Sequence, residues 1–195
     1  THRREAEQRG KLHRQPCARR IIGLTGHPPY HYIRKRRSGR KELDVHQSQV
    51  DLTMDLRTGF PRSMRVKMEG YVHLARMIDK CRAVLAGTEG EYIYPCPMDD
   101  RLMRFTGITD KEFTATVKAH PTDKGVAQWF KKASNPHPQI ELNEWNEMML
   151  TRGPSTPDKQ KYFNKLRDAV DPSRTDLTAW SDLQDLEEGR TVPKR

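Results

Sequence analysis

The sequence predicts an all-α fold, a compact bundle of six or seven short helices around one long central helix, preceded by a mobile basic arm. Two observations predict it. Apolar residues recur with helical spacing in the segment 70–86. Beyond Met54, N-cap residues, prolines and glycines divide the rest of the chain into short helical segments.

The central helix is expected from about Gly70 to Ala86, a segment without an internal proline. Gly87 follows at the position where a left-handed C-terminal residue is expected. One face of this helix carries apolar residues at the spacing of a buried stripe, namely Tyr71, Leu74, Met77, Ile78, Cys81 and Leu85. The segment 91–95 is expected to be an extended loop or an edge strand.

The remaining helices are predicted from their boundaries. Thr109 and Glu112 form a capping-box pattern, and Thr156 followed by Pro157 is a typical helix start. Thr122 or Asp123 caps a further helix. The expected ranges are 97–105, 109–120, 123–133, 141–151, 157–170 and 177–186.

Positive charge is concentrated in the first quarter of the chain. Residues 1–53 hold 13 Lys/Arg and 5 Asp/Glu, most of the net charge of +10. Such a segment buries too little apolar surface to offset its ordering entropy, so we interpret it as a disordered basic extension of a single helical domain, 54–195. Met54 suggests the hypothesis that the native protein begins near this residue and that 1–53, lying upstream of it, does not belong to the native protein.

The arm could contact nucleic acid by counterion release, chiefly through Arg34, Lys35, Arg36 and Arg37. Solvated disorder explains the same composition equally well, because no recognition fold or stacking motif accompanies the charge.

The sequence does not favour a membrane protein, an exported protein or a metal-binding protein. No stretch approaches the roughly 18 apolar residues of a membrane span, and no signal-peptide pattern appears. The three cysteines are an odd number and form no C-x-x-C pair, which favours a cytoplasmic location. Histidines and cysteines show no zinc spacing, so no metal or other cofactor is predicted.

Asp79 is the most distinctive charged residue of the predicted central helix. On a helical wheel it lies among small and apolar residues, away from a basic strip formed by His73, Arg76 and Lys80. A buried carboxylate must be paired or protonated, and the candidate partners are Arg62 and Arg82. Asp79 is therefore either a functional carboxylate or half of a structural ion pair, and the structural interpretation is favoured.

Two further features near this helix have ordinary explanations. The glycines of the segment 87–92 are typical of a turn after a helix, and the P-loop order is absent. Cys96 lies between two prolines, and a packed or exposed side chain is favoured over a nucleophile.

A set of short motifs resembles the bacterial domain-of-unknown-function family 5069 over residues 55–186. These motifs are Pro61-Arg62-Ser63, Gly70-Tyr71-Val72, Ala75-Arg76-Met77 with Asp79-Lys80 and Arg82-Ala83, Gly87-Thr88 with Gly90-Glu91-Tyr92, and Cys96-Pro97-Met98-Asp99. The resemblance implies a small cytoplasmic helical domain and no particular activity. This chain departs from the pattern at Glu69, where a second glycine is expected, and in the basic arm.

Three functions follow as hypotheses. The first, and preferred, is a small-ligand or protein interaction module with its site at Arg62, Asp79, Arg82, Glu91, Tyr92 and Asp99. The second is an enzyme in which Asp79 or Glu91 acts as the base and Arg82 or Lys80 holds an anionic small molecule. The third is a nucleic-acid-associated protein that acts through the arm.

Overall fold

The computed structural model describes residues 55–194, which form seven α-helices and no strand within that range. The all-α prediction is confirmed. In chain order the helices are α1 (Leu74–Ala86), α2 (Pro97–Thr106), α3 (Asp110–Ala119), α4 (Asp123–Ala133), α5 (Gln139–Thr151), α6 (Pro157–Val170) and α7 (Trp180–Glu187). The basic arm, its Arg34–Arg37 segment and the predicted boundary at Met54 lie outside the described residues.

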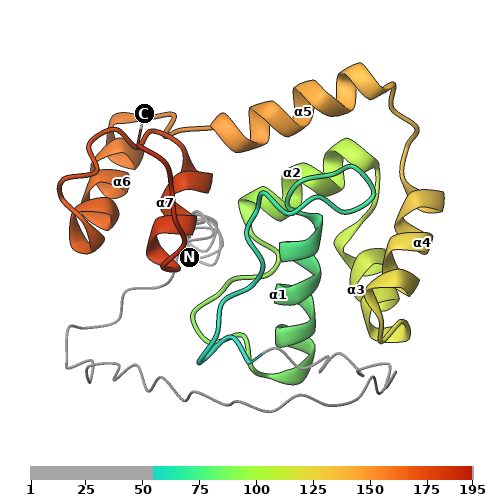
Figure 1. The fold of residues 1–195 in the computed structure, drawn as a ribbon. Helices are drawn as coiled ribbons and strands as arrows, with labels where there is room; N and C mark the ends of the chain where they lie inside the picture. Colours follow the sequence, from blue (N-terminus) through green and yellow to red (C-terminus); the bar gives the residue numbers. More distant parts are fainter. Residues whose placement is uncertain (1–54, 195) are drawn as a thin grey trace, which may run out of the picture.

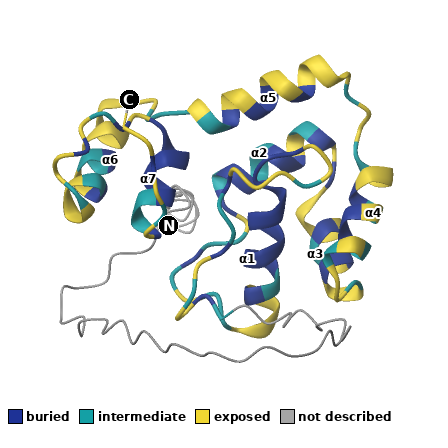
Figure 2. Ribbon diagram, in the orientation of Figure 1, coloured by how far each residue is buried: buried dark blue, intermediate teal, exposed yellow. Residues whose placement is uncertain are grey.

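Helix α1 occupies the centre of the fold, with α2, α3 and the loop before α1 around it (Figure 1). Most of its residues are buried, so the ribbon is dark blue along most of its length (Figure 2). The helix ends as predicted, because Gly87 adopts a left-handed φ of 68° and donates to the Val84 carbonyl oxygen.

The start of α1 was predicted four residues too early. Gly70 and His73 have φ values of 85° and 68°, which a right-handed helix does not allow. Tyr71 instead exchanges backbone hydrogen bonds with Met68, forming an isolated bridge. The apolar periodicity at Tyr71 and Val72 therefore reports burial in a tight loop rather than helix.

The predicted caps explain three of the six other helix starts. Glu112 donates its backbone N–H to the Thr109 hydroxyl and accepts the Thr109 N–H in return, which completes the capping box of α3. Thr122 and Thr156 cap α4 and α6 in a similar way. Helix α7 starts later than predicted, because a turn that joins Leu177 to Arg174 occupies its expected first residues.

Two large, separate apolar cores support the fold, together with a small cluster of Leu56, Ala83 and Tyr92. The larger lies among α1 to α5 and includes Phe105 of α2, which stacks on Trp145 of α5 with 4.9 Å between ring centroids. The smaller lies between α6 and α7 and includes Phe163 and Leu183. Helix α5 runs from α4 to the α6–α7 pair along one edge of the molecule (Figure 1). Among residues 55–194, no helix combines the length and apolar character needed to cross a membrane.

Candidate functional site

Five of the six predicted site residues lie in three groups of charged side chains around α1. Arg62, Asp79 and Arg82 lie in one network, Tyr92 in a second and Asp99 in a third. The first two groups are connected, because Arg76 Nη1 donates to the Arg62 carbonyl oxygen at 3.1 Å. Glu91 is half-buried in the segment between α1 and α2.

The first network is built on Asp79, whose exposed fraction is only 4%. Its carboxylate accepts the backbone N–H of Arg62 at 2.8 Å. It also accepts the Arg62 guanidinium through Nε at 2.9 Å and Nη2 at 2.7 Å. The loop before α1 is thus held to the middle of the helix by a charge-assisted, two-pronged contact.

Asp123, at the start of α4, extends this network to the surface. It accepts Nη1 of Arg62 and Nη1 of Arg82, both at 2.6 Å. Burial alone would lower the pKa of Arg62, but its bonds to Asp79 and Asp123 outweigh burial and raise that pKa above its ordinary value. The predicted partner Arg82 therefore pairs with Asp123, and two carboxylates balance two guanidiniums.

The second network joins α1 to the end of α7. Arg76 is fully buried and forms a two-pronged pair with Glu188, including a 2.9 Å bond between Nη1 and Oε2. The Tyr92 hydroxyl donates to Glu188 at 2.9 Å, and Arg190 also pairs with this carboxylate. Burial would raise the pKa of Glu188, but the bonds from Arg76 and Arg190 lower it overall.

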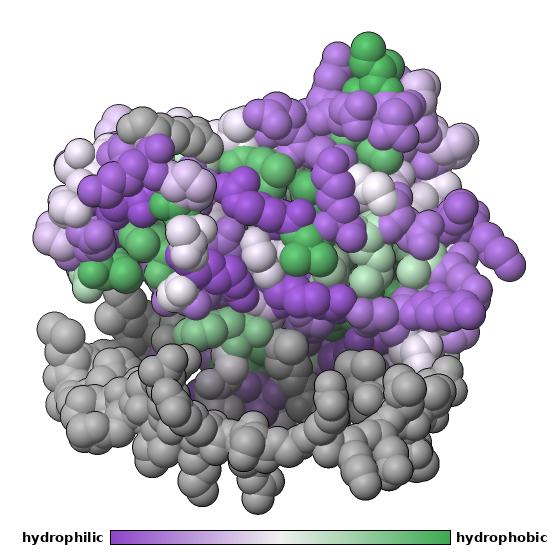
Figure 3. Space-filling model, in the orientation of Figure 1, coloured by the Kyte–Doolittle hydropathy of each residue, from purple (hydrophilic) through white to green (hydrophobic). Residues whose placement is uncertain are grey.

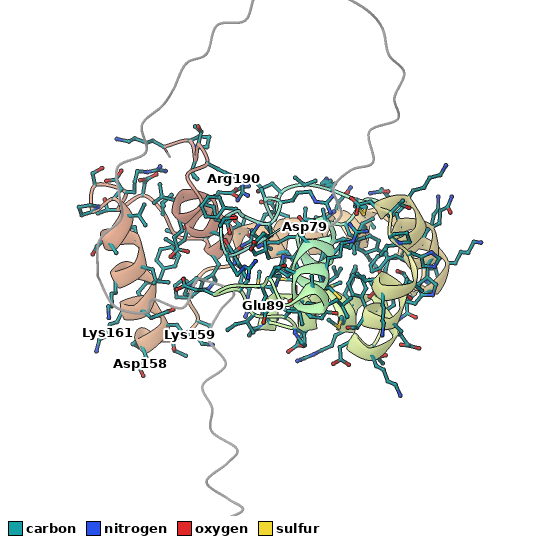
Figure 4. All side chains as sticks on the ribbon, turned by 90° about the horizontal axis from the view of Figure 1, so that it is seen from below. Asp79, Glu89, Asp158, Lys159, Lys161 and Arg190 are labelled. Carbon is teal, nitrogen blue, oxygen red and sulfur yellow. The ribbon has the colours of Figure 1, made fainter. Side chains whose placement is uncertain are left out.

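Further polar contacts connect the same two parts of the fold. Arg65 pairs with Asp182 and Asp185 of α7, and Arg190 donates to the Pro61 carbonyl oxygen at 2.6 Å. Asp79 and Arg190 both lie near the middle of the molecule when it is seen from below (Figure 4). Charged and polar contacts thus connect the loop before α1 to α7.

The third group lies entirely in the interior. Asp99 accepts Lys80 Nζ at 2.7 Å and bonds His73 Nε2 at 2.8 Å, and all three side chains are fully buried. Asp99 also accepts the backbone N–H of Cys96 and so caps α2. Burial alone would raise the pKa of Asp99, but the Lys80 charge and the His73 bond lower it to about 2.

His73 is neutral in this group. Since the ionised Asp99 can only accept, the His73 proton lies on Nε2, and the buried Nδ1 has no hydrogen-bond partner. A second proton on Nδ1 would therefore be buried without an acceptor, and burial lowers the pKa of His73.

A metal-ligand set also occurs here, which sequence spacing did not indicate. Ligand atoms of His73, Cys96 and Asp99 lie within 4.8 Å of one another. The Lys80 ammonium, however, contacts Asp99 and lies 3.2 Å from the Cys96 sulfur. Lys80 supplies the positive charge that a cation would bring, so the geometry fits an internal ammonium better than a metal ion.

An open groove of about 440 Å³ lies elsewhere, between the end of α2 and the start of α3. Met103, Arg104, Ile108 and Asp110 are among its lining residues. None of the six predicted site residues lines it.

These features define an all-helical domain whose charges around α1 are paired internally. The chain matches the family described as Domain of unknown function (DUF5069) over residues 58–190, and it therefore belongs to that family. No curated protein matches the chain.

Proposed function

We propose that this domain is a non-catalytic interaction module, which binds a small ligand or a protein on its surface and uses the charges beside α1 as a framework. One observation carries the proposal. Both oxygens of Asp79 are occupied by Arg62, which itself pairs with Asp123 at the surface.

Acid–base catalysis needs a carboxylate with an available lone pair and access to substrate. Asp79 offers neither, since it is almost fully buried and accepts several donors from Arg62. Asp99 is more deeply buried and is neutralised by Lys80.

The outer members of the first network are available to a partner. Arg62 and Asp123 keep 28% and 37% of their side-chain surface exposed. The face drawn in Figure 3 is mostly hydrophilic, and its hydrophobic side chains form small separate groups. Recognition through polar and charged groups is therefore favoured over docking on a large apolar patch.

The test is a ligand-identification experiment on the full chain and on Asp79→Asn. Native mass spectrometry of the purified protein is combined with a thermal-shift screen of metabolites and anions. We expect Asp79→Asn to lower the melting temperature while leaving any ligand-induced shift unchanged. A shift that disappears in Asp79→Asn, at unchanged basal stability, would instead place a functional pocket at α1 and favour the enzyme.

The proposal also concerns the origin of the protein and the role of the basic arm. A bacterial, cytoplasmic origin rests on the family resemblance and on the odd number of cysteines. Nucleic-acid binding through Arg34–Arg37 stays an alternative, and a salt-dependent affinity that vanishes on removal of 1–53 would support it.

A further inference from the structure

Three arginines outside the networks around α1 belong to α2 and to the C-terminal end of α5, two helices that are in contact through Phe105 and Trp145. Arg101 and Arg104 lie on α2 three residues apart, a spacing that places them on neighbouring positions of one helix face. Arg101 is half-buried and Arg104 is exposed. Arg104 also lines the groove at the end of α2.

Arg152, the C-cap residue of α5, is brought to the same place by the packing of the two helices. Phe105 of α2 stacks on His137, just before α5, and on Trp145, in its middle. Arg101 lies one turn before Phe105, and Arg152 lies two turns after Trp145. The helices run in opposite directions at this contact, so Arg101 faces the end of α5 that carries Arg152.

Arg101 lies within the electrostatic influence of the other two arginines. Partial burial, followed by the positive charges of Arg152 and Arg104, lowers the pKa of Arg101. The charges of Arg104 and Arg152 therefore both repel the Arg101 guanidinium, and no ion pair within residues 55–194 offsets that repulsion.

This absence of pairing distinguishes them from the other arginines. Within residues 55–194, eight arginines form an ion pair with a carboxylate: Arg57, Arg62, Arg65, Arg76, Arg82, Arg167, Arg174 and Arg190. In the same range only Arg101, Arg104 and Arg152 have none, and the charges of Arg104 and Arg152 both act on Arg101. A cluster with unbalanced like charge is destabilising on its own, so it is best explained by a ligand that balances it.

We propose that Arg101, Arg104 and Arg152 form a binding site for a phosphate group. A guanidinium offers a planar fork of N–H donors, which matches two oxygens of a phosphate at once. Three guanidinium groups around one phosphate dianion can donate to its oxygens, and the dianion neutralises most of their positive charge. The groove that Arg104 lines also contains Asp100 and Asp110, whose negative charges disfavour a phosphate within the groove itself.

The cluster shares no residue with the networks around α1. A negative result for the phosphate site would therefore leave the proposed framework role of Asp79 intact. A negative result for the framework role would likewise leave the phosphate site intact.

The test measures phosphate affinity of the full chain by isothermal titration, at constant ionic strength because exposed charges are screened by salt. Inorganic phosphate and glycerol phosphate serve as separate probes, which distinguish free phosphate from a phosphate ester. The variants are Arg104→Gln and Arg152→Gln. The control is Lys161→Gln, which removes an exposed positive charge from the first half of α6, on the side away from α1 (Figure 4).

We expect saturable binding by the wild type and by the control, and a loss of roughly tenfold in affinity for each arginine variant. Arg152→Lys should fall between them, because it keeps the charge but loses the fork. Without phosphate, each glutamine variant should melt at or above the wild-type temperature, since repulsion is relieved. Equal affinity in all proteins would assign phosphate binding to other cations and overturn the proposal, as would no saturable binding by the wild type.

Discussion

Arg76 and Glu188 form a buried, two-pronged ion pair that joins the central helix to a residue 112 positions later in the chain. The apolar side chains of the two cores belong to separate clusters, one around α1 to α5 and one between α6 and α7. This pair, with Tyr92 and Arg190 beside it, is therefore a principal link between the two.

The first prediction concerns this link. Glu188→Gln leaves the Arg76 charge buried without its counter-ion, so we expect a loss of about 3 kcal/mol in the free energy of unfolding. Denaturant unfolding measures the loss, and hydrogen exchange should show faster exchange in α7. Glu144→Gln makes the same chemical change at an exposed position and should have little effect. Wild-type stability in Glu188→Gln would show that the pair does not join the two cores.

The second prediction is a pH dependence that arises from His73. Burial holds its pKa below the ordinary 6.5 in the folded protein, so below that pH the unfolded chain binds a proton that the folded chain does not. Stability is fully present above pH 6.5 and falls as the pH decreases, by up to about 1.4 kcal/mol per pH unit.

Urea unfolding between about pH 7.5 and 5.5 checks this prediction, because acidic groups contribute mainly at lower pH. His73→Asn should flatten the profile, and asparagine tolerates the left-handed backbone of this position. His120→Asn, at a half-exposed position, is the control. The prediction fails if His73→Asn keeps the wild-type slope.

The third prediction concerns Glu69, where the family resemblance leads one to expect glycine. Glu69 has a φ of 50°, in the left-handed region that favours glycine. Its contact with Lys131, at 4.0 Å, is exposed and contributes little. Glu69→Gly should therefore stabilise the fold by up to about 1 kcal/mol, as measured by the denaturation midpoint. Glu69→Ala keeps the strain and serves as the comparison, and equal stability of the two variants would argue against strain at this position.

Local signals predicted the helices well because caps act within a few residues. Thr109 with Glu112 and Thr156 with Pro157 mark the starts of α3 and α6 as expected. The start of α1 was predicted wrongly because the apolar pattern continues from the helix into the preceding loop. The left-handed φ of His73 marks the boundary between loop and helix, and the sequence pattern does not show that angle.

The charged networks were predictable only where both partners belong to the central helix and its adjoining loop. Arg62 was identified as a candidate partner of Asp79, and the two are paired. Asp123 and Glu188 were missed, because each comes from a helix or helix end distant in sequence. The helical wheel placed Arg76 and Lys80 on a separate strip, but burial of that strip depends on partners that no local pattern indicates.

The most direct test of the framework role is a double-mutant cycle on Asp79 and Arg62. Unfolding free energies of the wild type, Asp79→Asn, Arg62→Gln and the double variant give the coupling between the two side chains. The framework account predicts a favourable coupling of about 1–3 kcal/mol, with clear destabilisation by Asp79→Asn alone. A coupling near zero, with Asp79→Asn as stable as the wild type, would contradict it and reopen the case for Asp79 as a functional carboxylate.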